Sequence, residues 1–402
     1  MSRFIPREAF ALPALLIALG SSTAVAPPAQ AAASWSAPVQ LPGLCGASIA
    51  VNAAGALVSA GSSNANMSVQ VCTSPDGQSW SAPVTLAQGV SPDVAIAPDG
   101  RAVAVWAGVQ GTETVQASVR PPGGQWSTAV TLATDYGPPL IGIDGSGNAI
   151  AAWVAANGAI DTASLPAGGR WTKVRTLAAR GQALSLAVNS TGAAIVTWGT
   201  RSATLADSGS VLGGFATPVT VGPPPPYPIG YAHVALNDAG QAALGWDMSG
   251  ASMAATRSAD GAWSSPTQLS TTTGPVDVAI DGAGDAIAVF EQVQTTIPGS
   301  PYTAAFTSTR PAGVNWGPPT LLSAPGDEAT GARAVADAAG TFVVAWGDRT
   351  TRTLNVLTSP PGGGFGPAAT FPVGLDDLKI APGHAVLTLG GAPMMASIEN
   401  VS

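Results

Sequence analysis

The sequence repeats itself about every 47 residues, and this period restricts the folds that the chain can adopt. The repeated element is an aromatic residue followed by a segment rich in Pro, Thr and Val, such as WSAPVTLA (80–87). The aromatic residues of its copies are Trp35, Trp80, Trp126, Trp171, Phe215, Trp263, Trp316 and Phe365. A repeat of this length predicts an array of small structural units that stack on one another.

The rest of each unit also repeats, and its pattern is typical of short strands. One segment ends in an Asx-x-x-Gly turn, as in LIGIDGSG (140–147). In such a turn the Asx oxygen accepts backbone N–H groups and the glycine supplies a positive φ. The Asx residues expected to act in this way are Asp144, Asn189, Asn237, Asp281 and Asp337. An apolar segment such as AVAVW (102–106), a more polar strand and the aromatic-headed strand complete four strands per unit.

Composition agrees with this interpretation. Glycine (49) and proline (35) together make up about a fifth of the 402 residues, and charged residues make up 9 %. Helix bundles and coiled coils need charged faces and few breakers, so both are disfavoured. Four short strands in about 47 residues match a propeller blade. We therefore expect an all-β fold, an eight-bladed β-propeller built from four-stranded antiparallel blades.

The ends of the chain indicate how the ring closes. The segment 35–41 resembles a fourth strand, whereas 377–380, 385–389 and 394–399 resemble the first three strands of a unit. Pairing them would complete an eighth blade and remove two exposed sheet edges. Seven blades remain the alternative if these weaker segments do not pair.

Several tryptophans end the apolar second strands: Trp106, Trp153, Trp198, Trp246 and Trp346. They could form stacking platforms for sugars. Because they recur once per blade whatever the neighbouring loops, we expect them to pack in the core between blades.

The N-terminal segment has the layout of a secretory signal peptide. Arg3 and Arg7 precede an apolar run over 9–20, and Ala29-Gln30-Ala31 provides a small-x-small cleavage site. We expect residues 1–31 to be removed and residues 32–402 to form a single secreted domain, although cleavage after Ala33 is also possible. No later apolar run reaches the roughly 18 residues of a membrane span.

The charge of the chain bears on its binding partners, and its two cysteines bear on a possible disulfide. With 15 basic residues and a net charge of −8, the chain lacks the basic footprint of a nucleic-acid-binding protein. We expect a monomer. Cys45 and Cys72 could form a disulfide in an exported protein. The predicted strands place them at far-apart ends, however, and a bond needs Cα atoms within about 7 Å, so free thiols are favoured.

Two turns carry a family resemblance. Ser74-Pro75-Asp76-Gly77-Gln78-Ser79-Trp80 resembles the Asp-box, Ser-x-Asp-x-Gly-x-Thr-Trp, but is one residue short, and the segment 258–263 is shorter still. With the period and strand order, this resembles the secreted bacterial sialidase-like propellers with BNR repeats. The resemblance implies that the Asp-box is a turn device.

The sialidase catalytic set is not evident. The family's Phe-Arg-Ile-Pro signature is missing, because Arg3-Phe4-Ile5-Pro6 has another order and lies in the predicted signal peptide. The only histidines, His233 and His384, are far apart in sequence, which gives little support for a zinc site or a His-dependent triad. We predict no catalytic residue, no metal and no cofactor.

The candidate binding site is one mouth of the central channel. The first residues of the innermost strands should meet there, and five of these eight positions can be charged. Long loops over 222–231, 291–302 and 347–352 should surround the same mouth. The alternative is that strand ends simply place polar groups in water. The candidate contacts are Asp93, His233, Asp277, Arg333, Asp377, Tyr227, Tyr231, Glu291, Tyr302 and Arg349.

These observations predict a secreted, non-catalytic binding module, with a glycan or a cell-envelope polymer as its ligand. One alternative is a sialidase-like glycoside hydrolase or lyase, which would need paired carboxylates across the mouth, such as Asp93 or Asp277 with Asp377. The other is a protein-interaction scaffold that uses the rims of the blades.

Overall fold

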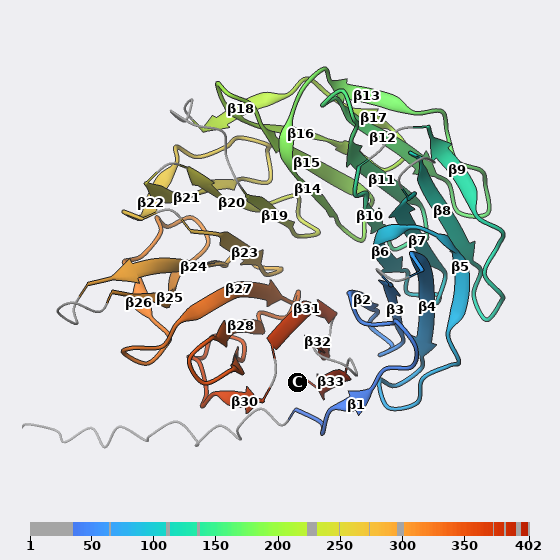
Figure 1. The fold of residues 1–402 in the computed structure, drawn as a ribbon. Helices are drawn as coiled ribbons and strands as arrows, with labels where there is room; N and C mark the ends of the chain where they lie inside the picture. The colour runs from blue at the N-terminus through green and yellow to red at the C-terminus, as the bar shows by residue number, and fades with distance from the viewer. Residues whose placement is uncertain are drawn as a thin grey trace, which may run out of the picture. The chain divides into compact units, whose positions relative to one another are not determined.

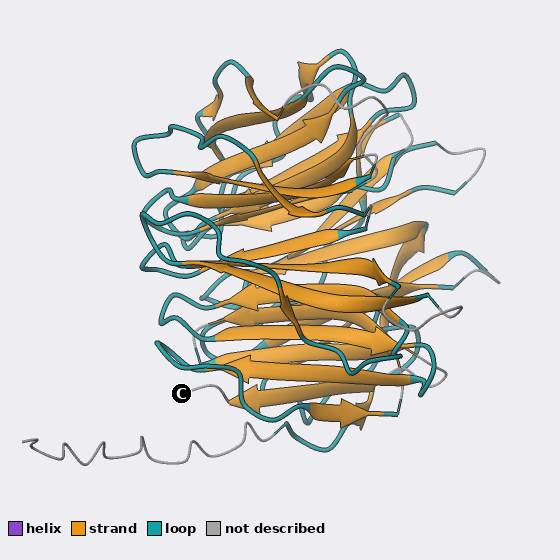
Figure 2. Cartoon of the chain, turned by 90° about the vertical axis from the view of Figure 1, so that its left-hand side faces the viewer, coloured by secondary structure: helices purple, strands orange, loops and turns teal. Residues whose placement is uncertain are grey.

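The computed structural model describes most of the chain from Trp35 to Asn400. The residues outside this description are 1–34, 64–65, 110–112, 135–136, 223–230, 249, 273, 296–300, 373, 382, 391–394 and 401–402. The predicted signal peptide therefore lies outside the described residues. By their contacts, residues 33–402 form one compact unit. The described residues of this unit form strands, turns and loops and contain no helix (Figure 2). Among them, accordingly, is no helix with the length and apolarity that a membrane crossing requires.

The described strands form eight antiparallel sheets, which we number in chain order. Within each sheet the strands are given from the innermost outward. Sheet 1 contains β2 (Ser48–Val51), β3 (Leu57–Ser62), β4 (Ser68–Ser74) and β5 (Val84–Gln88). Sheet 2 contains β6 (Val90–Ile96), β7 (Ala102–Ala107), β8 (Val115–Arg120) and β9 (Val130–Ala133). Sheet 3 contains β10 (Leu140–Ile143), β11 (Ala149–Val154), β12 (Ile160–Leu165) and β13 (Arg175–Ala178). Sheet 4 contains β14 (Gln182–Val188), β15 (Ala193–Gly199) and β16 (Thr204–Ser210), with β17 (Gly214–Phe215) and β18 (Val219–Gly222) both pairing with β16.

The second half of the chain continues the pattern. Sheet 5 contains β19 (Ala232–Leu236), β20 (Ala242–Met248), β21 (Ala251–Arg257) and β22 (Thr267–Ser270). Sheet 6 contains β23 (Val276–Ile280), β24 (Ala286–Gln294), β25 (Tyr302–Arg310) and β26 (Thr320–Leu321). Sheet 7 contains β27 (Ala329–Ala336), β28 (Phe342–Asp348), β29 (Thr353–Ser359) and β30 (Ala369–Phe371). Sheet 8 contains β31 (Gly374–Ala381), β32 (His384–Gly390), β33 (Met395–Asn400) and β1 (Val39–Gln40).

The eight sheets are arranged as the blades of a β-propeller (Figure 1). The innermost strand of each sheet contacts the innermost strand of the next, and β31 contacts β2 to complete the circuit. The predicted closure is also present, because β1 pairs antiparallel with β33 through Val39–Ala396 and Gln40–Met395. The all-β propeller prediction is confirmed, and the described sheets agree with eight blades.

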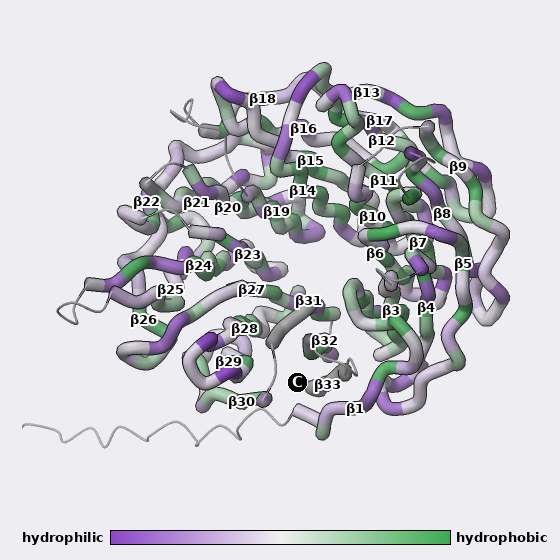
Figure 3. Tube along the Cα trace, viewed as in Figure 1, coloured by the Kyte–Doolittle hydropathy of each residue, from purple (hydrophilic) through white to green (hydrophobic). Residues whose placement is uncertain are grey.

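The core lies between successive blades. The second strands are buried along most of their length, and β7 along all of it, and they are largely coloured as hydrophobic in Figure 3. The tryptophans that end these strands are at most 3 % exposed, and Phe290 takes the same place in sheet 6. Their predicted role in packing is therefore confirmed for Trp106, Trp153, Trp198, Trp246 and Trp346.

The turns between first and second strands form as predicted. Asp281, for example, accepts the N–H groups of Ala283 and Asp285 at 2.9 and 2.8 Å. Where the residue is asparagine, its amide also donates to the next blade, as from Asn237 to the Asp281 carbonyl at 2.8 Å. These turns therefore tie neighbouring blades together at the face opposite the predicted mouth.

The degenerate Asp-box is a turn in the structure. The Oδ1 atom of Asp76 accepts N–H groups from Gln78 at 2.9 Å and Ser79 at 2.8 Å, and these bonds hold the pKa of Asp76 below its usual value. The indole N–H of Trp80 donates to the Gly77 carbonyl at 3.2 Å. Every one of these contacts lies within the turn.

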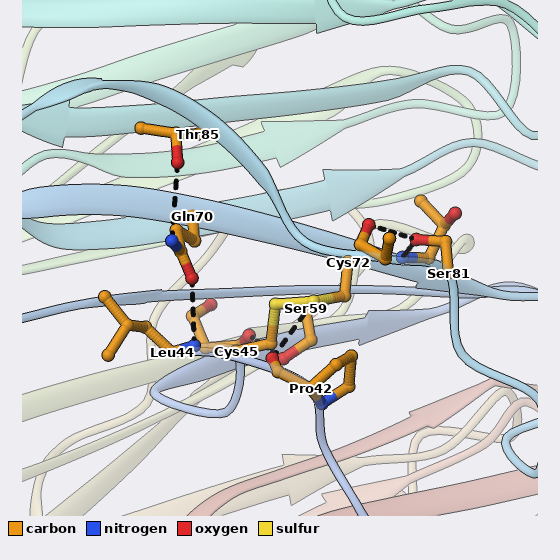
Figure 4. The surroundings of a disulfide bond; sticks show 11 residues. Pro42, Leu44, Cys45, Ser59, Gln70, Cys72, Ser81 and Thr85 are labelled. Atoms are coloured by element: carbon orange, nitrogen blue, oxygen red, sulfur yellow. Dashed lines mark hydrogen bonds between the residues drawn. A yellow bond between two sulfur atoms is a disulfide. The ribbon is translucent and has the colours of Figure 1, made fainter.

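The preference for free cysteines was wrong. Cys45 and Cys72 form a disulfide with a Cα–Cα distance of 6.1 Å (Figure 4). Cys45 does not begin a strand but lies in a turn that folds back over β3 toward β4, where Cys72 lies. Gly61 allows this close approach, since a Cβ atom there would lie 1.7 Å from the Leu44 carbonyl oxygen. The Leu44 N–H also donates to Gln70 on β4 at 3.1 Å.

This bond gives a first testable prediction. Replacing Cys45 and Cys72 together by alanine should lower the free energy of unfolding by about 3 kcal/mol, because the bond closes a loop across a separation of 27 residues. Urea denaturation of the oxidised parent and of the double variant measures this difference. The denatured, unreduced parent should show no reactive thiol, and detection of two thiols would contradict the bond.

Candidate functional site

The mouth of the channel lies where the innermost strands begin and the second strands end. A cavity of about 770 Å³ opens there. Its polar lining residues come from six of the eight sheets: Ser48, Ser62, Ser91, Asp93, Ser185, His233, Arg333, Asp377 and Lys379. An adjoining compartment of about 390 Å³ shares His233, Arg333, Asp377 and Lys379 with this cavity, and its remaining lining is Asp277 with Gly142 and alanine and branched apolar side chains. The fold thus gathers charge at one end of an apolar channel.

Backbone irregularities position several of these residues. In β6, β14, β27 and β31 the register with the second strand shifts just before Asp93, Ser185, Arg333 and Asp377. Ser91 and Ala183, within two of these shifts, have φ values of 51°. A bulge bends the strand locally and re-aims the side chain that follows. The site residues therefore sit on a rigid inner strand but at a locally adjusted angle.

Asp93 joins three blades. Its Oδ2 atom accepts the N–H of Ile141 in the next blade at 2.9 Å. Its Oδ1 atom accepts a hydrogen bond from the Ser48 hydroxyl of the preceding blade at 2.9 Å. The same atom accepts the N–H of the next residue, Val94, at 3.0 Å. Burial raises the pKa of Asp93, against the opposing effects of Lys379 and of the Ile141 N–H.

Asp277 and Asp377 repeat this arrangement. The Oδ2 atom of Asp277 accepts the N–H of Ala334 at 3.0 Å, and that of Asp377 accepts the N–H of Ile49 at 3.0 Å. In each case the donor lies on the innermost strand of the next blade. The Oδ1 atoms accept the N–H groups of the residues that follow, Val278 and Leu378, at 3.0 and 2.9 Å. Both oxygens of each carboxylate are therefore engaged within the protein.

These contacts change the interpretation of the acidic candidates. Asp93, Asp277 and Asp377 link consecutive blades, and Ser185 does the same through a 3.1 Å bond from the Val234 N–H. Asp277 is only 5 % exposed. We conclude that the three carboxylates hold the ring together at the mouth and that their oxygens have limited capacity left for a ligand.

The basic side chains at the mouth are more open to solvent. The side chain of His233 is 47 % exposed and its Nδ1 atom contacts Asp277. Arg333 is exposed, and its Nη1 donates to the Ala332 carbonyl at 3.2 Å. Lys379, 45 % exposed, lies 3.5 Å from Asp377. The carboxylates of Asp377, Asp93 and Asp277 raise the pKa of Lys379, so its ammonium group stays charged.

Lys379 was not among the sequence-based candidates, although a signal for it exists. Residues two apart on a strand point to the same face. Lys379 follows Asp377 by two positions on β31, so a ring residue at 377 also implied a side chain at 379 that faces the channel. The same rule applied to His233, Asp277 and Arg333 gives only apolar residues at the second position, Ala235, Ala279 and Val335.

Two other charged candidates lie beside the mouth, outside the lining of its cavity. Glu291 on β24 accepts the N–H of Ala332 at 3.2 Å, and burial raises the pKa of its carboxyl. Arg349 is exposed and donates to the Thr330 hydroxyl at 3.0 Å. Both residues support β27, which carries Arg333.

The three candidate tyrosines have different positions. Tyr302 begins β25 and is 6 % exposed, so its ring is packed in the protein and we do not retain it as a ligand contact. Tyr231 is 62 % exposed, but its side chain does not line the cavity. Tyr227 lies outside the described residues.

Comparisons with known proteins show the fold. No protein-family model matches the sequence, and no curated protein matches it. The structure is similar to BamB from Moraxella catarrhalis, a β-propeller protein, with a TM-score of 0.56 and 12 % identity over 91 % of this chain and 99 % of that chain. YCF48 bound to D1 peptide gives a TM-score of 0.48 and 14 % identity over 93 % and 99 % of the two chains. Polysaccharide lyase Uly1 gives 0.48 and 10 % identity over 75 % and 88 %.

Proposed function

We propose that the mature chain is a secreted, non-catalytic binding module that holds a carbohydrate polymer at the channel mouth. The observation that carries the proposal is that the acidic and the basic side chains at this mouth have different contacts. The carboxylates of Asp93, Asp277 and Asp377 bind the neighbouring blades, whereas Arg333, His233 and Lys379 are exposed to a cavity of about 770 Å³. A cavity of this size accommodates a short stretch of a saccharide chain.

The chemistry of the exposed groups narrows the ligand. Arginine and lysine only donate hydrogen bonds, so they favour ligands rich in acceptors. A carboxylate or sulfate group suits them best, because charge-assisted hydrogen bonds are stronger than neutral ones and arginine binds such groups with two parallel bonds. The ligand class that we propose is therefore an acidic polysaccharide of a cell envelope or matrix, held through single acidic groups by Arg333 and Lys379.

The position of the acidic residues favours binding over catalysis. A glycoside hydrolase needs a carboxylic acid and a carboxylate that face the sugar on both sides of the bond to be broken. Here the oxygens of each candidate carboxylate accept backbone N–H groups of the protein. The proposed relation to the sialidase-like BNR propellers therefore rests on the repeat and the Asp76 turn, and it does not extend to the chemistry.

An array of acidic and neutral polysaccharides tests this function directly. We expect the purified chain, residues 32–402, to bind uronate-containing or sulfated members saturably. Soluble fragments of the same polymer should compete. Absence of binding to every polysaccharide would overturn the proposal and favour a scaffold for protein partners.

The basic residues provide the second testable prediction. Arg333→Gln and Lys379→Gln should each weaken binding of the acidic polymer about 10- to 100-fold, since a hydrogen bond to a charged group contributes about 1.5–3 kcal/mol. Arg201→Gln is the matched control, because Arg201 is exposed in a loop at the same face. Titration by biolayer interferometry measures the affinities. Equal affinities for all three variants would place the ligand elsewhere.

A further inference from the structure

A second cavity lies on the opposite face of the ring, between sheets 6 and 7. Its volume is about 300 Å³. It is lined by the turn between β23 and β24, the end of β25, the start of β28 and the turn that follows β29. The side chains that matter below are those of Asp285, Thr309, Arg310, Phe342, Ser359 and Phe365.

Phe342 interrupts the repeat at this place. It pairs with the last residue of the innermost strand, Ala336. At the same register position the other seven sheets have alanine six times and leucine once, each paired with a branched aliphatic residue. In sheet 7 the small residue, Ala336, lies on the innermost strand and the large one, Phe342, on the second strand, which reverses the order in the other sheets. This exchange of volumes explains how the blade accommodates the phenylalanine.

Packing between the blades covers only part of the Phe342 side chain. The matching residue in each of the other seven sheets is at most 2 % exposed, whereas Phe342 is only half-buried. Its covered part contacts the core between sheets 6 and 7, as does the half-buried Phe365. The exposed part of each ring lines the cavity. An apolar face left open in this way is a surface on which a ligand can lie.

Arg310 provides a hydrogen-bond donor beside these rings. The arginine at the same register position in sheet 5, Arg257, donates to the Gly240 carbonyl at 2.7 Å. Arg310 is half-buried, and within the described part of the chain its guanidinium makes no hydrogen bond or ion pair. Asp285 lies on the same lining, with Oδ1 bound to the Ala312 N–H at 2.7 Å.

We propose that this cavity binds one neutral sugar ring. The rings of Phe342 and Phe365 offer faces for the C–H side of a pyranose, while Arg310, Asp285, Thr309 and Ser359 offer donors and acceptors for its hydroxyl groups. The volume is near the lower limit of roughly 300–1,000 Å³ for small-molecule sites, which suits a single residue. Asp281 and Asp285 both line the cavity, so an acidic sugar would be repelled. The site is independent of the mouth.

The experiment uses the whole chain and the methyl glycosides of glucose, galactose, mannose, fucose and N-acetylglucosamine as probes. Saturation-transfer NMR identifies a bound glycoside, and calorimetry gives its affinity. Phe342→Leu, which keeps an apolar side chain on Ala336 but removes the aromatic face, should weaken binding at least tenfold. Arg310→Gln should do the same. Arg120→Gln is the matched control, because Arg120 has the same register position in sheet 2.

The outcomes separate this site from the mouth. Binding that is lost in Phe342→Leu and Arg310→Gln but unchanged in Arg333→Gln supports the site. Binding lost only in Arg333→Gln would overturn it and leave the mouth as the sole sugar site. If none of the glycosides binds, this site is refuted, whereas binding of an acidic polymer at the mouth is still measured separately. Melting curves of each variant show that the loss does not come from unfolding.

Discussion

A chain that begins at Pro42 should lose about 5 kcal/mol of unfolding free energy relative to one that begins at Ser34. The deletion removes β1 and leaves the edge of β33 open, since β1 is its partner. It also removes Leu41, which is 2 % exposed, and Trp35, whose ring lies edge-on to Phe371 at 6.2 Å. Burial of one large apolar side chain stabilises a protein by about 1.5–3 kcal/mol, and emptying its site adds a cavity term.

The loss would be comparable with the whole stability of a typical domain, about 5–15 kcal/mol. Equilibrium unfolding in urea, followed by tryptophan fluorescence and by circular dichroism, measures it. Trp35→Ala in the longer chain is the control, because it removes one contact but keeps the strand pairing. Equal urea midpoints for the two chain lengths would show that the ring does not depend on β1.

The repeat made the architecture readable from the sequence. A blade-sized period, strands of alternating character and an Asx-Gly turn at a constant place all describe one unit, and eight copies reinforce the pattern. The closure by β1 could also be predicted, because the first strand-like segment resembles the fourth strand of a unit and the last unit has only three. These are properties of local sequence and order, so they need no knowledge of contacts between blades.

The sequence did not allow a prediction of which residues of the candidate site contact a ligand and which bind the next blade. A polar residue at the start of an inner strand looks the same whether it faces a ligand or binds the next blade. The difference lies in its partner, an N–H group about one period further along, such as Ile141 for Asp93. The sequence does not show which backbone N–H group a carboxylate will accept. For this reason the carboxylates were predicted to be ligand contacts.

The disulfide was missed for a related reason. Strand patterns place residues along a strand, but Cys45 lies in a turn whose path depends on Gly61 and Gln70 in other strands. Bulges before four of the ring residues also depend on backbone geometry that the repeat does not reveal. In each case a tertiary contact, and not a local preference, decided the outcome.

The second large effect is expected for Asp277→Ala, which should lower the free energy of unfolding by about 4 kcal/mol. The substitution leaves the N–H groups of Ala334 and Val278 without their acceptors, at about 1–3 kcal/mol each when buried, and it removes the partner of His233. Ligand binding at the mouth should then fall only as far as the ring loosens. Glu113→Ala, at an exposed carboxylate near the same face, is the control and should change stability little.

The stability that Asp277 contributes should depend on pH, and the pKa of Asp277 sets the direction of this dependence. Burial opposes ionisation of Asp277, but His233, Arg333 and the Ala334 N–H outweigh it and hold its pKa below the usual value. The stability that Asp277 contributes is therefore present above the unfolded pKa of about 3.9 and disappears as the pH falls through the lower folded value. The difference between the parent and Asp277→Asn should shrink below about pH 4.

Asp93 should behave in the opposite way, because burial raises its pKa. Its contribution is present below about pH 3.9 and is lost as the pH rises through the higher folded value. Asp93→Asn, which resembles the protonated form, should therefore cost less stability at pH 7 than Asp277→Asn. Urea titrations between pH 3 and 7 compare the two variants. Parallel profiles would mean that the two carboxylates hold the ring in the same charge state.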